Sequence, residues 1–183
     1  MDLFATVETE VKKPILKKIT LQNYRNIDYK VITVGEKGLI LQGKNGVGKT
    51  NIIEGIYRNL SGKLFNGSSK SDTQAVTPTS NPKAKTSVKL EFDKDNFSFE
   101  LISYEEYKKD GSYKGTAYDY YVNEALTNKK QALDVLYNYL GIKELTDRWA
   151  KDDKSNIDLI DLLFNVNYVK HVDYKWLRAL VVD

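Results

Sequence analysis

One short stretch of the chain carries the residue types that bind phosphate groups. An apolar run at 39–42 ends in Gly43, four residues follow, and then come Gly48, Lys49 and Thr50. This is the pattern G-x-x-x-x-G-K-[ST] of a phosphate-binding loop. Glycines let the backbone N–H groups curl inward, at the positive end of the following helix. A glycine-rich turn with a chance Lys-Thr pair is the alternative, but the strand–loop–helix context favours a nucleoside triphosphate site.

The positions of this loop have different predicted roles. Lys49 would reach the β and γ phosphates, and the Thr50 hydroxyl would bind the Mg²⁺ ion that bridges them. Backbone N–H groups would hold the remaining phosphate oxygens. The predicted cofactor-binding residues of the loop are Gly43, Asn45, Gly46, Val47, Gly48, Lys49, Thr50 and Asn51.

The composition indicates one ordinary globular domain. The chain has 183 residues, of which 41% are hydrophobic and 29% charged, and we expect it to be cytoplasmic and without membrane contact, because no long apolar run or signal peptide is visible. The absence of cysteine excludes disulfides. The formal net charge of +3 is too small to indicate a nucleic-acid partner. Two groups of lysines could still form a basic face or an ordinary solvated surface: Lys12, Lys13, Lys17 and Lys18, and Lys63, Lys70, Lys83, Lys85 and Lys89.

Hydrophobic patterning predicts the elements that position the loop. Alternating residues predict strands at 15–24 and 29–34, and the continuous apolar run at 39–42 predicts a strand buried on both faces. Apolar residues at helical spacing predict a helix over 49–60, which ends at Gly62. We expect this helix to pack on the sheet.

The segments that follow predict antiparallel strands and then helices. Alternation predicts a hairpin over 87–101, and a turn at 109–111 leads to a tyrosine-rich strand at 118–122. These tyrosines could stack on bases, but their period of two favours half-buried positions in a sheet. Asn128 and Gln131 predict a helix start. Further expectations are an irregular or helical segment at 144–154, a short helix near 157–164, a strand at 166–169 and a final helix after 173.

Two segments together resemble the start of a known ATPase family. Residues 19–26 read ITLQNYRN and residues 39–56 read LILQGKNGVGKTNIIEGI. They look like the amino-terminal start of SMC-like and RecF-like ATPases, which are ABC-type ATPases of DNA repair and chromosome maintenance. Asn45 and Asn51 make the match more specific than a bare phosphate loop. Weaker similarity continues to about residue 142. Because the family's signature motif and Asp-Glu strand lie on a carboxy-terminal half and are not visible here, the chain resembles an amino-terminal half alone.

The resemblance implies an α/β fold, namely a P-loop NTPase lobe of the ABC-ATPase head type. Such a lobe has a mixed sheet, an antiparallel β-rich subdomain and flanking helices. We expect a single lobe over 1–183, in which 14–62 hold the strands, the phosphate loop and the first helix. The lobe would also contain a mobile loop at 63–86, an antiparallel β subdomain at 87–127 and a helical part at 128–183 with a returning strand.

The resemblance also implies cofactors and partners. ATP and Mg²⁺ would be held between two heads, so that ATP binding joins the chain to a complementary ATPase lobe or to a second copy and closes a clamp on DNA. A nuclease subunit is a further implied partner. Arg25 would approach the nucleotide or help to bind DNA, or it would serve only in a surface turn.

Several parts of this family are not visible in the sequence. There is no LSGGQ-like signature, no apolar strand that ends in Asp-Glu, and no glutamine beyond Gln131 for the contact with Mg²⁺. His171 is expected on the surface or partly packed, and the tail at 180–183 fits a helix better than a Mg²⁺-binding strand. The catalytic residues therefore stay unassigned, and we expect the isolated chain to bind ATP with little or no hydrolysis.

Two other classes of function stay open. One is a noncatalytic, nucleotide-switched module of phage or mobile-element type that binds DNA or protein. The other is a small P-loop kinase or GTPase, although neither an arginine-rich lid nor an N-K-x-D motif is visible.

Overall fold

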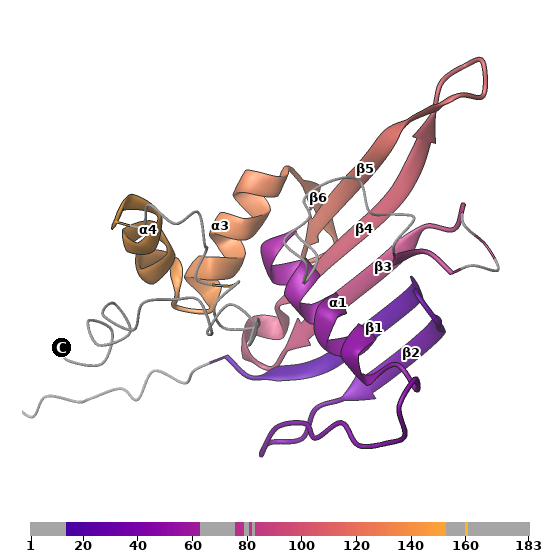
Figure 1. The fold of residues 1–183 in the computed structure, drawn as a ribbon. Helices are drawn as coiled ribbons and strands as arrows, with labels where there is room; N and C mark the ends of the chain where they lie inside the picture. The colour runs from indigo at the N-terminus through magenta and orange to yellow at the C-terminus, as the bar shows by residue number, and fades with distance from the viewer. Residues whose placement is uncertain (1–13, 63–75, 79–80, 82, 153–159, 161–183) are drawn as a thin grey trace, which may run out of the picture.

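The computed structural model describes residues 14–62, 76–78, 81, 83–152 and 160 of the chain. Strands and helices within these ranges form a single sheet with helices packed against it (Figure 1). The strands are β1 (Leu16–Tyr24), β2 (Ile27–Thr33), β3 (Thr86–Phe92), β4 (Ser98–Tyr107), β5 (Tyr113–Val122) and β6 (Ala125–Thr127). The helices are α1 (Lys49–Ser61), α3 (Lys129–Tyr139) and α4 (Lys143–Asp152), with a short 3-10 helix, η1, at Lys94–Asn96.

The six strands form one antiparallel sheet in the order β2-β1-β3-β4-β5-β6. Residues directly opposite each other in neighbouring strands place their side chains on the same face. Ile19 lies opposite Leu90, and Leu21 lies opposite Val88. All four side chains are buried, so this face of the sheet is the core face.

Helix α1 packs very closely on the core face. A Cβ atom at Gly55 would lie only 3.0 Å from Cδ2 of Leu21, so the absence of a side chain lets the helix backbone reach the sheet. Helix α3 lies beside α1, where the Tyr137 hydroxyl donates to the Leu60 carbonyl at 2.8 Å. The two helices therefore share the burial of the same apolar layer, which is the main stabilising contribution in such a fold.

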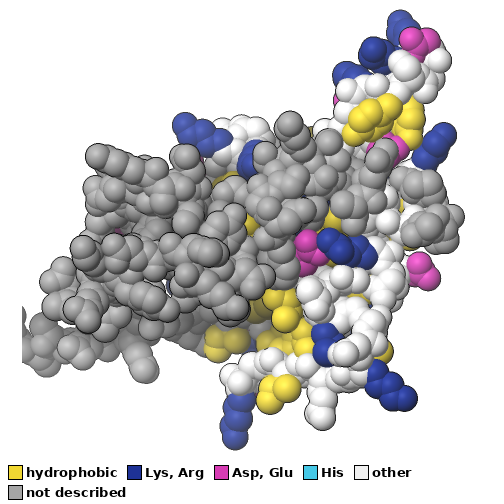
Figure 2. Space-filling model, in the orientation of Figure 1, with side chains coloured by type: hydrophobic (Ala, Val, Ile, Leu, Met, Phe, Trp, Pro, Cys, Tyr) yellow, Lys and Arg dark blue, Asp and Glu magenta, His cyan; other side chains and the backbone are white. Residues whose placement is uncertain are grey.

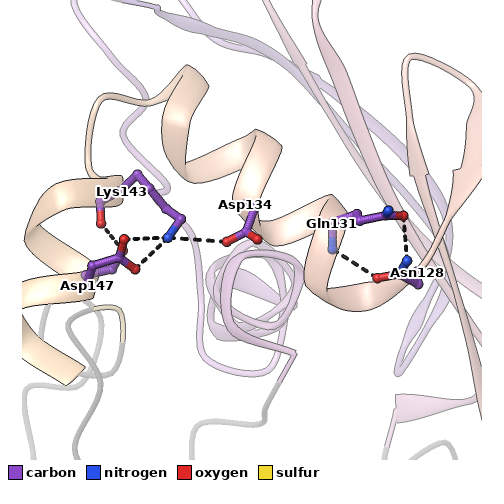
Figure 3. Close-up of polar contacts among 6 residues, drawn as sticks. Asn128, Gln131, Asp134, Lys143 and Asp147 are labelled. Carbon is purple, nitrogen blue, oxygen red and sulfur yellow. Dashed lines mark hydrogen bonds and ion pairs between the residues drawn. The ribbon is translucent and has the colours of Figure 1, made fainter. Parts of the chain in front are cut away.

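Polar contacts stabilise the start of α3 and its junction with α4 (Figure 3). Asn128 accepts the N–H of Gln131 at 3.0 Å, and its own amide donates back to the Gln131 side chain. This reciprocal cap confirms the predicted helix start. Lys143 lies 3.4 Å from Asp134 of α3 and 2.5 Å from Asp147 of α4. The Lys143 ammonium group thus links the two helices.

Most of the predicted elements are confirmed. The strands at 15–24, 29–34 and 87–101 correspond to β1, β2 and the β3–β4 hairpin, and the turn at 109–111 separates β4 from β5. Helix α1 ends at Gly62 in the left-handed conformation, with φ at 70° and its N–H bonded to the Arg58 carbonyl. The segment at 144–154 is helical as far as Asp152.

The predicted strand at 39–42 is wrong. These residues are not part of the sheet, and Ile40 is 91% exposed, although a strand buried on both faces would enclose it. A buried strand needs neighbours on both edges and a layer on each face, and the described part of the chain supplies none for this run. Every strand pair in the described sheet is antiparallel, so the expected mixed sheet is wrong for these residues.

Other predictions fall partly or wholly outside the described residues. Within the expected mobile loop, residues 76–78 are instead buried, and the Val76 carbonyl accepts the N–H of Arg25. Ile160 is helical and 1% exposed. The remaining predictions for the carboxy-terminal part lie outside the described residues. They are the helix near 157–164 apart from Ile160, the strand at 166–169, the final helix after 173, His171 and the tail at 180–183. Among the described helices, none has the length and apolar character that crossing a membrane requires.

Candidate nucleotide-binding site

A pocket of about 380 Å³ lies where the predicted phosphate loop meets the first turn of α1. Six of the eight loop residues selected above line it. Gly43 contributes its carbonyl group to a contact with Lys49, and Val47 is 58% exposed. The lining residues are Asn45, Gly46, Gly48, Lys49, Thr50 and Asn51.

The loop conformation requires glycine at two positions. Gly46 and Gly48 have φ angles of 84° and 96°, in the left-handed region that side chains strain. At Gly46 the space is open, so the backbone angle alone sets the requirement. At Gly48 a Cβ atom would also lie 3.2 Å from the side-chain oxygen of Asn26. The glycine pattern in the sequence therefore corresponds to left-handed backbone angles in the loop.

The amino-terminal end of α1 leaves backbone donors for an anion. Gly48 is the N-cap residue, no side chain caps the helix, and the first turn contains no acidic residue. The first N–H groups of a helix have no partner within the helix, and its dipole favours negative charge at this end. The chemistry of these groups fits a phosphate.

Lys49 and Thr50 are the two side chains of the pocket with predicted roles toward phosphate and Mg²⁺. The Lys49 ammonium group donates to the carbonyls of Gly43 and Lys44, at 2.7 and 2.8 Å. An ammonium group has three N–H donors, so one of them is still available to a phosphate oxygen. Thr50 is exposed in the lining of the pocket. No group of three or more acidic or histidine side chains among the described residues could hold a metal. A Mg²⁺ ion here would depend on Thr50, phosphate oxygens and water.

Asn26 supports the loop, although the sequence did not single it out. Its side-chain amide donates to the Gly46 carbonyl at 3.2 Å, and its oxygen accepts from the Asn51 amide at 2.7 Å. The turn between β1 and β2 is thereby held against the loop. The available signal was its place at the end of the ITLQNYRN segment, next to Arg25.

Arg25 does not line the pocket. Its guanidinium group lies 2.7 Å from the Glu54 carboxylate of α1, and the Glu54 side chain is only 5% exposed. Arg25 has a φ of 53°, and its N–H donates to the Val76 carbonyl. Arg25 therefore links the β1–β2 turn to α1 and to residue 76. It does so on the side of α1 that faces the core.

A buried polar cluster lies beneath α1. Arg58 is 3% exposed, donates to the Ser103 hydroxyl at 3.0 Å and lies 5.7 Å from the ring centre of Tyr118. Burial, with a smaller contribution from the Glu54 carboxylate, raises the pKa of the neighbouring Tyr24 hydroxyl, which therefore stays neutral. Asn59 donates to the Val88 carbonyl at 2.7 Å. These contacts fix α1, and with it the phosphate loop, on the sheet.

Comparison with known proteins agrees with the resemblance found in the sequence. The profile of a protein family described as the AAA domain matches residues 18–170. This chain is also similar to the DNA replication and repair protein RecF of three bacteria. It is 45% identical over 42 residues to the protein of Geobacillus kaustophilus, 44% over 50 residues to that of Desulfitobacterium hafniense and 42% over 43 residues to that of Acholeplasma laidlawii.

These similarities to RecF proteins are local. They cover 23%, 27% and 24% of this chain and only 11%, 14% and 12% of the respective relatives. The family profile, in contrast, extends over the strands, the phosphate loop and the helices described above. The chain therefore belongs to the AAA domain family, and the predicted relationship to SMC-like and RecF-like ATPases is confirmed.

Proposed function

We propose that this chain is the ATP-binding lobe of an SMC-like or RecF-like DNA repair or recombination ATPase. The observation that carries the proposal is the pocket in which Lys49, Thr50 and the uncapped start of α1 converge. The backbone N–H groups of the loop and the Lys49 ammonium would hold the phosphates. Mg²⁺, bound at Thr50, would neutralise charge on the phosphate oxygens. Loop residues Gly43, Asn45, Gly46, Val47, Gly48 and Asn51 would complete the nucleotide site.

The proposal includes a second lobe. Hydrolysis requires a positioned water and a base, and none of the residues that line the described pocket carries a carboxylate. Leu39 and Ile40, just before the loop, and Val47, within it, are 38%, 91% and 58% exposed. We take these exposed apolar residues as part of a surface that another protein covers. A complementary ATPase lobe or a second copy would supply the missing catalytic groups and cover these residues.

The remaining partners follow from the relationship to RecF. We propose DNA as the macromolecule whose binding is coupled to ATP-dependent head engagement, a nuclease subunit as a further partner, and the cytoplasm as the location. The name of the relatives, DNA replication and repair protein RecF, supports this assignment.

The test is the binding of a fluorescent ATP analogue, with and without Mg²⁺. The Lys49→Ala chain should bind at least tenfold more weakly, because a charge-assisted contact to phosphate is lost. The matched control is Lys44→Ala, since Lys44 lies in the same loop with an exposed side chain and offers only its carbonyl to Lys49. Equal affinities of the two variants would overturn the proposed site.

A second candidate function is a noncatalytic switch in which ATP binding changes association only. The carboxylate-free pocket lining favours this alternative. ATPase assays on the isolated chain should give little turnover under either proposal, so robust Lys49-dependent turnover would contradict both. The switch would be selected if, after a complementary lobe is added, association depends on ATP but no ATP is hydrolysed.

A further inference from the structure

The β4–β5 hairpin extends beyond the rest of the sheet and ends in charged side chains (Figures 1 and 2). We call residues 104–114, which form the outer part of this hairpin, the hairpin arm. In Figure 1 the arm points away from the segment between β2 and α1 that contains the phosphate loop. Its surface can therefore bind a partner without sharing residues with the nucleotide site.

Five lysines gather on and beside the hairpin arm. Lys108, Lys109 and Lys114 belong to the arm, and Lys83 and Lys85 come from the segment that leads into β3. The Lys85 ammonium lies 4.3 Å from the ring centre of Tyr104, and the Lys83 ammonium lies 5.1 Å from that of Tyr107. Cation–π contacts of this kind hold the ammonium groups of a neighbouring segment against the arm.

The three carboxylates of the hairpin arm are engaged in local contacts. Glu105 accepts the Tyr107 hydroxyl, and Glu106 lies 2.9 Å from the Lys114 ammonium. Asp110 accepts from the Ser112 hydroxyl and N–H at 2.6 and 2.9 Å.

The two lysines at the tip are less constrained. Lys108 and Lys109 are exposed, and neither forms an ion pair in the part of the chain that the structure describes. Glu105 and Asp110 keep their negative charges, because their hydrogen-bond donors are neutral. The arm together with Lys83 and Lys85 has five lysines against three carboxylates, and this positive excess faces the solvent.

Tyrosines lie between these positive charges. Tyr107 and Tyr113 are 41% and 43% exposed, and their rings pack edge to face with centres 6.2 Å apart. An exposed ring beside lysine ammonium groups is the combination by which proteins hold a nucleic-acid strand, with cations on phosphates and rings on sugars or bases. An acidic peptide would use the lysines but would leave the ring surface of Tyr113 without an obvious role.

We propose that the hairpin arm binds DNA through its phosphodiester backbone, with Lys108, Lys109 and Lys83 as the main phosphate contacts. The choice of DNA as the polyanion rests on the proposed function. The location of the surface rests on the lysines and tyrosines themselves. Phosphate contacts carry no sequence information, so the arm supplies affinity and orientation rather than recognition of a particular site.

The test measures the binding of the full chain to labelled duplex and single-stranded DNA by fluorescence anisotropy, as a function of salt. The variant Lys83→Ser/Lys108→Ser/Lys109→Ser should lose about tenfold or more in affinity at low salt, and the salt slope should fall by about 2 to 3, because each lost phosphate contact removes about one released counterion. A variant with arginine at the same three positions should bind like the original chain.

The matched control removes three exposed lysines elsewhere, at Lys30, Lys37 and Lys130. If this control loses as much affinity as the arm variant, binding depends on overall charge and the proposal is overturned. Anionic lipid vesicles serve as a second probe, and arm-dependent binding to vesicles without binding to DNA would also overturn it. The variant Tyr113→Ala identifies the form of DNA that binds. If bases stack on the Tyr113 ring, this change should weaken the binding of single-stranded DNA more than that of duplex DNA.

Failure of this inference can be told apart from failure of the proposed function. The arm variant should bind the ATP analogue normally, and Lys49→Ala should keep its DNA affinity in the absence of nucleotide. Loss of ATP binding with intact arm-dependent DNA binding would concern the phosphate loop alone.

Discussion

The two ends of the sheet differ in how completely the chain satisfies its own contacts. At the β5–β6 end, α3 is capped by Asn128, tied to α1 through Tyr137 and joined to α4 through Lys143. At the β2 end, the chain leaves β2 as an edge strand and runs through the exposed Ile40 before it reaches the phosphate loop. The first end stabilises this chain, whereas the second presents the candidate nucleotide pocket and the exposed Ile40. We therefore expect residues at the first end to act in folding and residues at the second end to act in assembly.

The largest effect is expected at the β5–β6 end. Leu136 of α3 is fully buried in the apolar core. Leu136→Ala should lower the free energy of unfolding by about 2 to 5 kcal/mol, because apolar contacts are lost and a cavity remains. Urea unfolding followed by circular dichroism measures this change. A loss below about 1 kcal/mol would mean that α3 contributes little to stability and that the two ends do not differ as described.

A smaller loss of stability is expected at the tie between the β1–β2 turn and α1. Arg25→Ala leaves the buried Glu54 carboxylate without its partner, and we expect a loss of about 2 kcal/mol, below that of a fully buried pair because Arg25 is partly exposed. Urea unfolding again provides the measurement. The companion variant Arg25→Ala/Glu54→Gln should recover part of the loss. A tenfold drop in nucleotide affinity without loss of stability would instead restore Arg25 to the nucleotide site.

The contacts of Asn26 should affect the pocket more than the fold. Asn26→Ala removes hydrogen bonds to Gly46 and Asn51, each worth about 1 kcal/mol. We expect a five- to tenfold loss of ATP-analogue affinity, measured by fluorescence titration. Because Asn26 and Asn51 bond to each other, Asn51→Ala should cost a similar amount, and the double variant should cost less than the sum. Strict additivity would show that the two asparagines act separately.

The smallest effect on stability is expected at Ile40. Ile40→Ser should change the free energy of unfolding by less than about 0.5 kcal/mol, because the side chain is already in solvent. The same change should weaken association with a complementary lobe, which sedimentation velocity measures with and without ATP. A loss of stability above about 1.5 kcal/mol would place Ile40 in the core of this chain and erase the difference between the two ends.

Local signals predicted most of the fold and most of the pocket. Alternation within β1, β3 and β4, the cap at Asn128 and the glycine pattern of the loop each act over a few residues, so the sequence displays them directly. The tyrosine-rich segment is a strand of the sheet as predicted, with Tyr120 3% exposed and Tyr121 partly buried, whereas Tyr118 is 38% exposed.

Contacts between distant segments could not be predicted in this way. An apolar run such as 39–42 indicates burial, but it does not say whether the covering surface belongs to the same part of the chain. The Arg25–Glu54 ion pair joins a turn to a helix across 29 positions, and no spacing rule reveals it. Asn26 is a similar case, because its role depends on where the loop returns after β2.

The close approach at Gly55 has a mechanical consequence. A Cβ atom at Gly55 would lie 3.0 Å from Leu21 and 3.5 Å from Val88, so α1 packs too closely to tilt or slide without displacing the strands beneath it. We therefore expect helix and sheet to rotate together as one rigid block, so that strain from a ligand in the loop would pass to the whole block. The backbone between β2 and α1 is left as the place where such a rotation would be absorbed.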